Sequence, residues 1–238
     1  MKALLMAAGL GSRISGQIDG SPKCTIDIGN QALIENTILE LKRKGIHEIA
    51  MVVGYRAHVI TSLLGGENIR FFHNPFYDRT NSIASMWFAR DFLTDSDCLL
   101  LNADVYFEEQ VLDVVLQETR SPVMFADPFR RAEGDYKFGY ENGLLQKHGK
   151  ELPLEETTGE YVGIARLHRE FVPIFQERLQ SLILQRQHDL WWENVLYSFL
   201  GERDVHVAQI PPGLFWAEVD TWEDYKRILH FTNHLAHM

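Results

Sequence analysis

LLMAAGLGSRISGQIDGSPK, residues 4–23, is an apolar run that breaks into a glycine-rich loop and ends in Pro-Lys. The segment Lys2–Ala8 is apolar at nearly every position, which is typical of a strand buried on both faces of a parallel sheet. Ligands of such sheets bind beyond the carboxyl ends of the strands, where Gly9–Lys23 begins. Glycines expose backbone N–H groups to an anion, and Arg13 and Lys23 add two cations. The loop therefore predicts a polyphosphate site.

Two well-known glycine motifs fit this loop poorly. The dinucleotide fingerprint needs G-x-G-x-x-G leading directly into a helix, whereas the pattern here is G-x-G-x-R followed by a polar run with Pro22. A Walker loop needs G-K-[ST], which the chain lacks. The alternative is a solvated loop with incidental glycines, but the strand, loop, arginine and Pro-Lys together favour a functional loop.

The rest of the first half alternates between apolar strands and amphipathic helices. Strands are expected at Lys2–Ala8, Glu48–Gly54, Ile69–His73, Asp97–Leu101 and Val123–Ala126, with helices at Ala32–Lys44, Ala57–Leu64, Ser82–Phe92 and Glu108–Gln117. This alternation predicts an α/β, Rossmann-like sheet with helices on both faces. The second half predicts a hairpin at Tyr136–His148, strands at Glu160–Leu167 and 204–210, a short strand in residues 215–220, and helices at Phe171–Gln187, Leu190–Leu200 and Trp222–Leu235.

Composition limits the classes of function. The 238 residues include 33 acidic and 23 basic side chains, and a net charge of −10 argues against a nucleic-acid or anionic-membrane surface. Two cysteines without a C-x-x-C motif favour a cytoplasmic protein without a thiolate metal site. The apolar run Ala3–Ala8 is shorter than the roughly 7–15 residues of a signal peptide's core, and no run approaches the roughly 18 of a membrane span.

Carboxylates follow strands in two distant places. Asp104 comes after the apolar strand CLLL, and alternation in WAEVD puts Glu218 and Asp220 on one face. A divalent cation that bridges phosphates prefers hard oxygen ligands, usually one or two carboxylates. The alternative for Asp104 is an aspartate that merely caps a loop.

The glycine loop LLMAAGLGSR…SPK resembles the signature of the sugar-phosphate nucleotidyltransferase superfamily, an EC 2.7.7 type of enzyme. GYRAHVI, NPFYDRTNSIASMWFA, LLLNADVYF and WAEVDTWEDYKRI follow in the order that this superfamily has. The asparagine-rich segment and DLWWENV resemble most closely the phosphocholine and 2-aminoethylphosphonate cytidylyltransferase branch. The resemblance implies a mixed, mostly parallel sheet of the nucleotidyltransferase (GT-A-like) kind with a small covering insertion. The sequence has no repeat, low-complexity segment or linker, which predicts one domain, 1–238, with a nucleotide-binding core in 1–130 and an acceptor-binding part in 131–238 that completes the core.

The same resemblance implies a reaction and roles for residues. CMP would pass from CTP to a small phosphate or phosphonate, with release of pyrophosphate and with Mg²⁺ held by Asp104 and Asp220. Arg13 would grip the β- and γ-phosphates, and Lys23 would bridge the α-phosphate and the attacking oxygen. The residues expected to bind the nucleotide are Ala7, Ala8, Gly9, Gly11, Ser12, Arg13, Asn81, Ser82 and Asn102, although Asn81 or Ser82 is also a natural helix cap.

The acceptor pocket is expected near the adjacent tryptophans Trp191 and Trp192, which point about 100° apart on a helix, so that one can be core and the other line a pocket. Aromatic faces near carboxylates suit a cationic head group. The candidate residues are Tyr136, Glu160, Trp191, Trp192, Glu193 and Glu218. The stretch GEYVGIARL departs from the phosphocholine-enzyme pattern, which leaves an aminoalkyl phosphonate or a polyol or sugar phosphate open.

Three other functions remain open from the sequence. One is a sugar-1-phosphate or polyol-phosphate nucleotidyltransferase that uses UTP or another NTP. Another is a nucleotide-sugar glycosyltransferase, because Asn102–Asp104 is one residue short of D-x-D. The third is a non-catalytic nucleotide-binding module. The expected partners are CTP and a small phosphorylated acceptor, with a homodimer as one option for assembly.

Overall fold

The computed structural model of the protein describes residues 1–238 apart from 12, 13, 15, 30 and 236–238. Its described part contains a nine-stranded sheet in the order β3-β2-β1-β4-β9-β6-β10-β8-β7. The strands are β1 (Lys2–Ala7), β2 (Glu48–Val53), β3 (Ile69–His73), β4 (Cys98–Asn102), β6 (Val123–Asp127), β7 (Lys137–Glu141), β8 (Leu144–Gly149), β9 (Gly159–Leu167) and β10 (His206–Gln209). A separate two-stranded ribbon pairs β5 (Val105–Phe107) with β11 (Trp216–Glu218).

The strand directions confirm the mixed, mostly parallel sheet. The neighbours β3, β2, β1 and β4 are all parallel, and β10 runs parallel to β6. Strand β9 is antiparallel to both β4 and β6, and β8 is antiparallel to both β10 and β7. The ligand-binding edge is therefore the one where β1, β2 and β4 end.

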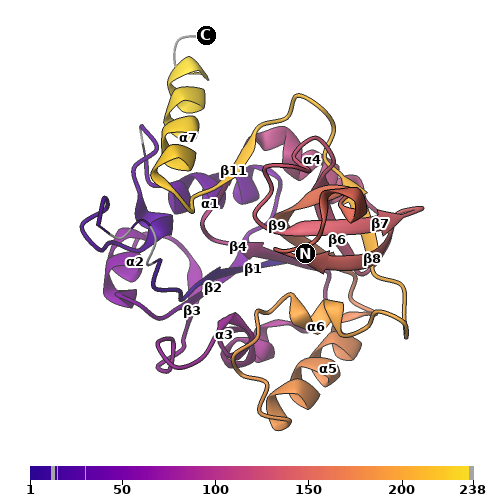
Figure 1. Cartoon of the computed structure of the whole chain (residues 1–238). Helices are drawn as coiled ribbons and strands as arrows, with labels where there is room; N and C mark the ends of the chain where they lie inside the picture. The colour runs from indigo at the N-terminus through magenta and orange to yellow at the C-terminus, as the bar shows by residue number, and fades with distance from the viewer. Residues whose placement is uncertain (12–13, 15, 30, 236–238) are drawn as a thin grey trace.

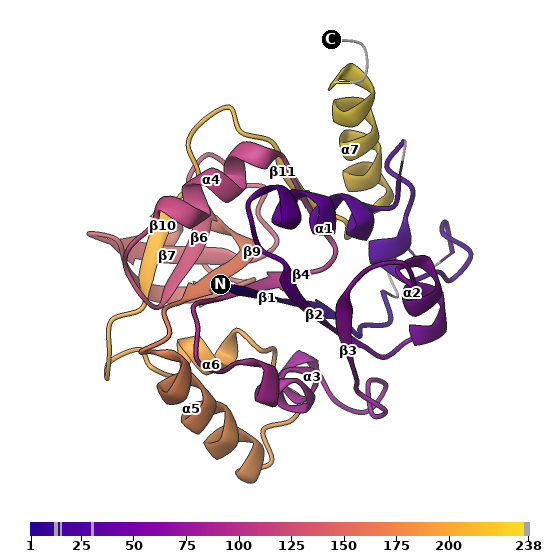
Figure 2. The same ribbon diagram turned by 180° about the vertical axis from the view of Figure 1, so that it is seen from behind.

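Helices cover both faces of this sheet, as Figures 1 and 2 show from opposite sides. The helices are α1 (Leu33–Arg43), α2 (Ala57–Leu63), α3 (Ser82–Phe88), α4 (Glu109–Gln117), α5 (Val172–Leu184), α6 (Asn194–Tyr197) and α7 (Trp222–Leu235). Alternate side chains of β1 explain the two layers, because Leu5 packs with α1, α2 and α4 while Leu4 packs with α3, α5 and α6.

The predicted hairpin forms, but it is part of the main sheet. Strands β7 and β8 turn at Asn142–Gly143 and complete one end of the sheet. The first residues of β7 pair with β9 as well, with Lys137 opposite Glu160 and Phe138 opposite Gly159. Strands β9, β6, β10, β8 and β7 consequently form a closed ring, so the hairpin is anchored at both of its edges.

Two predicted helices differ from the structure. Ser82–Phe92 divides into α3 and a 3₁₀ turn at Arg90–Phe92. In Leu190–Leu200 only Asn194–Tyr197 is α-helical, because the flanking residues form tighter i→i−3 hydrogen bonds, such as Asn194 N–H to the Trp191 oxygen and Phe199 N–H to the Leu196 oxygen. The Trp192 N–H, which has no partner within the segment, donates to Ser82 Oγ at 2.9 Å.

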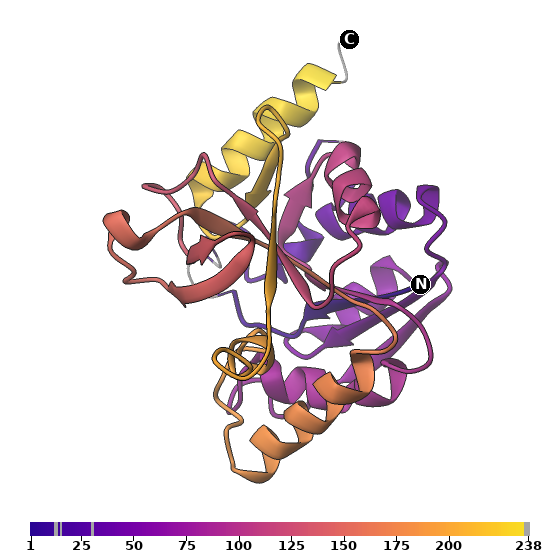
Figure 3. The ribbon, with the colours of Figure 1, turned by 90° about the vertical axis from the view of Figure 1, so that its right-hand side faces the viewer.

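A third, smaller core lies under α7, which projects from the body of the molecule in Figure 3. Ile228 of α7 packs with Tyr106 of β5, with Ala217 of β11 and with Ile14 from the loop after β1. This core fastens the β5–β11 ribbon to the amino-terminal loop. Among the described residues, no helix has both the length and the apolar character that crossing a membrane requires.

Candidate active site

Neighbouring parallel strands bring the glycine loop and Asp104 to one edge of the sheet. Met6 of β1 lies opposite Asn102 of β4, so the residues that follow both strands emerge side by side. They line a cavity of about 600 Å³. Its wall contains these predicted residues: Ala7, Ala8, Gly9, Gly11, Lys23, Asn81, Ser82, Asn102, Asp104, Tyr136, Trp191, Glu193, Glu218 and Asp220. Ser12 and Arg13 lie outside the described residues.

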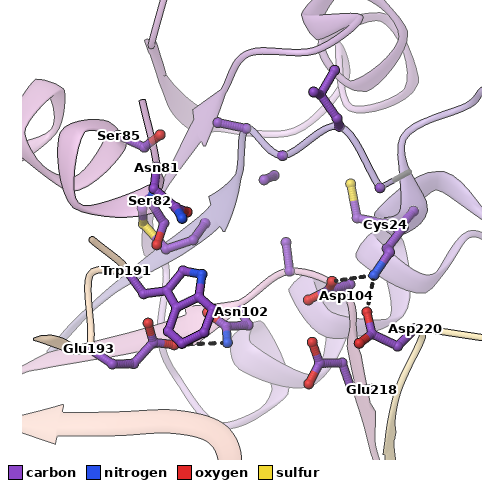
Figure 4. A pocket seen from close by; sticks show the side chains of 18 of the residues that line it. Cys24, Asn81, Ser82, Ser85, Asn102, Asp104, Trp191, Glu193, Glu218 and Asp220 are labelled. Carbon is purple, nitrogen blue, oxygen red and sulfur yellow. Dashed lines mark hydrogen bonds and ion pairs between the residues drawn. The ribbon is translucent and has the colours of Figure 1, made fainter. Parts of the chain in front are cut away.

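Three carboxylates converge at one side of this cavity (Figure 4). Oxygens of Asp104, Glu218 and Asp220 all lie within 4.8 Å of one another. The β5–β11 ribbon sets this geometry, because β5 starts directly after Asp104 and Glu218 lies opposite Val105. The Val219 N–H also donates to the backbone oxygen of Asp104 at 2.8 Å. Two segments more than a hundred positions apart in the sequence thus present one acidic cluster.

Lys23 lies inside the acidic cluster. Its Nζ is 3.4 Å from Asp104 Oδ2 and also forms an ion pair with Asp220 Oδ1. Burial of Lys23 disfavours its charge, but Asp104 and Asp220 outweigh burial and raise the pKa of the ammonium. Burial raises the pKa of Asp104 despite Lys23, and burial together with Asp104 and Asp220 raises the pKa of Glu218 well above its usual range. The cluster therefore holds more negative charge than one lysine neutralises.

This donor set fits a divalent cation. All three ligands are carboxylate oxygens, which hard cations such as Mg²⁺ prefer, and their spacing allows one ion to contact several of them. Burial and the repulsion from Asp104 and Asp220 together raise the pKa of Glu218, and an added positive charge would relieve the repulsive part.

The α3 end of the cavity offers groups that can hydrogen-bond a base. Asn81 is the helix cap, since its Oδ1 accepts from the Ser82 N–H at 2.8 Å, and it lines the cavity as well. Buried Asn74 holds the preceding loop by donating to Thr80 Oγ1 at 3.2 Å and to Ser85 Oγ at 2.9 Å. The loop and the start of the helix are therefore fixed relative to the cavity.

Trp192 does not line the cavity, unlike its neighbour Trp191. Its side chain is fully buried, and its Nε1 donates to Asn102 Oδ1 at 2.8 Å. Asn102 Nδ2 in turn donates to Glu193 Oε1 at 3.1 Å. Burial raises the pKa of Glu193 to about 7, although the bond from Asn102 opposes that shift. Trp192 therefore positions Asn102 and Glu193 and is not part of the acceptor surface.

Glu160 is also absent from the cavity wall. Its Oε2 accepts from Arg130 Nε at 2.6 Å, and its Oε1 accepts from the Asp135 N–H at 2.9 Å. Both contacts tie the segment before β7 to β9. Glu160 therefore supports the cavity-lining residues from outside the cavity wall.

Comparison with known proteins agrees with this geometry. Residues 3–190 match the model of the MobA-like NTP transferase domain. The chain belongs to this family. It is 32% identical to choline-phosphate cytidylyltransferase of Haemophilus influenzae over 96% of each chain. It is 29% identical to CTP:phosphoglutamine cytidylyltransferase of Campylobacter jejuni, over 94% of this chain and 97% of the relative.

A solved structure supports the fold. The CTP:phosphocholine cytidylyltransferase of Streptococcus pneumoniae superposes with a TM-score of 0.78 at 22% identity, covering 97% of this chain and 98% of that one. The resemblance drawn from the motifs is thus confirmed, and the MobA-like chain is a nucleotidyltransferase. Glu218 and Asp220 lie beyond the matched residues 3–190, so the acidic cluster is completed by a part of the chain that the family model does not cover.

Sequence reasoning missed several residues of this MobA-like site. Asp135, Lys150, Tyr161 and Tyr197 also line the cavity. Lys150 Nζ pairs with Asp135 Oδ2 at 2.6 Å and lies 5.6 Å from the centre of the Trp191 ring. For Asp135 and Lys150 the available signal was their position next to the two ends of the predicted hairpin, which does not by itself indicate a cavity. Tyr161 and Tyr197 lie within a predicted strand and a predicted helix, where an aromatic residue usually indicates core packing.

Proposed function

We propose that this nucleotidyltransferase transfers CMP from CTP to a small phosphate or phosphonate head group and releases pyrophosphate. The observation that carries the proposal is one cavity that joins the glycine loop, the Lys23-containing acidic cluster and an aromatic end. In this proposal residues 1–130 bind the nucleotide, and residues 131–238 complete the core and bind the acceptor. The names of the relatives, which use CTP and small phosphorylated acceptors, support cytosine over other bases.

The attacking oxygen belongs to a phosphate or phosphonate and is already an anion, so no general base is required. The enzyme must instead hold two mutually repelling anions together and neutralise charge on the phosphoryl oxygens. Gly9 and Gly11 expose the backbone to the triphosphate. Lys23 exchanges its carboxylate partners for the α-phosphate and the attacking oxygen.

Asp104 and Asp220 would hold Mg²⁺, with Glu218 as a further ligand or an acceptor contact. The bound ion supplies charge neutralisation on the phosphates. The role of Arg13 in gripping the β- and γ-phosphates rests on its place in the G-x-G-x-R loop. Asn81, Ser82 and Ser85 offer hydrogen-bonding groups to the base at the α3 end.

Pyrophosphate release from a panel of NTPs and phosphorylated acceptors tests the proposal. We expect turnover with CTP, Mg²⁺ and a head-group phosphate or phosphonate, and a loss of about 100-fold or more in kcat for Lys23→Ala with little change in CTP affinity. Turnover only with UTP and a sugar or polyol phosphate would show that both the nucleotide and the class of acceptor differ from those proposed. Consumption of a nucleotide sugar without any NTP would identify a glycosyltransferase, and metal-independent NTP binding without turnover would identify a binding module.

A further inference from the structure

A protein cation already covers the aromatic surface of the acceptor end. Lys150 follows β8, and Asp135 precedes β7, so the hairpin brings them together as an ion pair of 2.6 Å. The Lys150 ammonium stands 5.6 Å from the centre of the Trp191 ring. This separation is within the range in which a cation is attracted to an aromatic face. All three residues line the cavity.

A quaternary ammonium needs the same aromatic surface. The Tyr136 ring meets Trp191 edge to face, with centroids 5.4 Å apart and planes at 83°, and so occupies another part of the indole surface. A trimethylammonium group approaching Trp191 would have to displace Lys150 and would meet its positive charge at close range.

Hydrogen-bond donors are present at this end of the cavity as well. The Tyr161 hydroxyl is buried, and within the described part of the chain it has no hydrogen-bond partner. A buried hydroxyl without a partner is unfavourable, so a ligand atom that reaches it and accepts from it gains affinity. Lys150 adds N–H donors beyond the one directed at Asp135. Oxygen atoms of a ligand satisfy both groups, and a trimethylammonium group satisfies neither.

We propose that Lys150 determines acceptor specificity, excluding head groups with a quaternary ammonium and selecting those whose far end carries oxygen acceptors. The inference rests on the proposed nucleotidyl transfer and specifies its acceptor class. Hydroxyl and carboxylate ends share the required chemistry, and the test below separates them.

Turnover of three acceptors tests this specificity: phosphocholine, glycerol 3-phosphate and 3-phosphoglycerate. In the wild type we expect a lower kcat/KM for phosphocholine than for the better of the two oxygen-bearing acceptors. Comparison of those two acceptors shows whether the site prefers a hydroxyl or a carboxylate. Lys150→Ala should raise the ratio of kcat/KM for phosphocholine over the better oxygen-bearing acceptor by about tenfold, the size of a moderately desolvated cation–aromatic contact. A wild-type preference for phosphocholine, or an unchanged ratio in Lys150→Ala, overturns the inference.

Lys147→Ala is the matched control on the same hairpin. Lys147 pairs with Glu156 at 2.8 Å, its side chain is 54% exposed, and it does not line the cavity. We expect its acceptor ratio to equal that of the wild type. An equal rise of this ratio in Lys147→Ala would overturn the inference, because the change in specificity would then follow from the loss of any positive charge on the hairpin and not from a local effect at Trp191.

Binding of tetramethylammonium tests the inference without turnover. We expect tryptophan fluorescence to report saturable binding to Lys150→Ala and none to the wild type or Lys147→Ala. Absence of the new binding in Lys150→Ala overturns the inference even if nucleotidyl transfer is observed. If binding appears while no acceptor is turned over, the role of Lys150 stands and the proposed function fails.

Discussion

Replacing Lys23 by methionine removes the ammonium from a cluster of three carboxylates while preserving most of the side-chain volume. Asp104, Glu218 and Asp220 offer oxygens within 4.8 Å of one another, and two unit charges at that separation repel by about 3.5 kcal/mol at an effective dielectric constant near 20. The side chains of Asp104 and Asp220 are 25% and 16% exposed, so water screens them only in part. We therefore expect Lys23→Met to lower the free energy of unfolding at pH 7 by about 3 kcal/mol.

The loss should depend on pH in a defined direction. The pKa values of Asp104 and Glu218 are already raised in the folded protein, and removal of Lys23 raises them further. When the pKa of an acidic group is higher in the folded than in the unfolded protein, the free energy of unfolding falls as the pH rises from the unfolded-state pKa to the folded-state pKa. The difference in free energy of unfolding between the wild type and Lys23→Met should therefore be larger at pH 7 than at pH 5. The lysine itself does not contribute to this change, because its raised pKa lies far above both conditions.

Urea unfolding of wild type and variant at pH 5 and pH 7 measures both quantities. Lys44→Met is the matched control, because Lys44 also contacts two carboxylates, Glu109 and Asp113, each at 2.7 Å. Those carboxylates are 48% and 45% exposed, so we expect Lys44→Met to lower the free energy of unfolding less than Lys23→Met does. We also expect the effect of Lys44→Met to be the same at pH 5 and pH 7. The reasoning is refuted if Lys23→Met loses no more than Lys44→Met, or loses equally at both pH values.

Gly11 has φ +59°, and an added Cβ would lie 2.9 Å from a side-chain carbon of Lys23, so Gly11→Ala should lower the free energy of unfolding in urea by about 1 kcal/mol and also reduce activity. A Cβ added at Gly9 would meet no described atom within 4 Å, so Gly9→Ala should leave the free energy of unfolding unchanged while raising the KM for CTP. A loss of stability in Gly9→Ala would contradict this expectation. Trp192→Phe should lower the free energy of unfolding by about 1–3 kcal/mol, because it removes the donor to the half-buried Asn102 amide and part of a fully buried ring, whereas Trp191→Phe should change acceptor KM alone; equal stability losses would contradict the assignment. Asp104→Asn should abolish the rise in Tm that we expect Mn²⁺ to give the wild type, and a retained rise would exclude this carboxylate as a ligand.

Most of the fold could be predicted because apolar strands and amphipathic helices carry strong local signals. Ile69–His73 has its predicted bounds, and β1 and β2 each end one residue before their predicted ends. Strand β5 was missed because three residues cannot show a period, and its partner β11 comes more than a hundred residues later. The segment Leu190–Leu200 was predicted as a helix from its helical hydrophobic pattern, but the backbone forms i→i−3 turns on both sides of α6, which a periodicity of apolar residues does not distinguish from an α-helix.

The nucleotide side of the site was easier to predict than the acceptor side. Gly9, Gly11 and Asp104 all follow closely on strands, and the topology of a parallel sheet brings such residues together. Lys23 comes at the end of the loop after β1 and was predicted from the motif. The acceptor side depends on pairs that no local pattern marks, such as Glu160 with Arg130. Sequence reasoning accordingly placed Glu160 in the pocket and overlooked Lys150, although both are polar residues in or next to β-strands.

The β5–β11 ribbon has a consequence for biosynthesis. Asp104 is translated long before Glu218 and Asp220, and the ribbon that aligns them needs Trp216–Glu218 as its second strand. A nascent chain on the ribosome can therefore form the glycine loop and the strands beside it but cannot assemble the acidic cluster. An unfinished polypeptide that ends before residue 218 therefore lacks two of the three carboxylates of the proposed metal site, and under the proposed function it is unable to transfer a nucleotide.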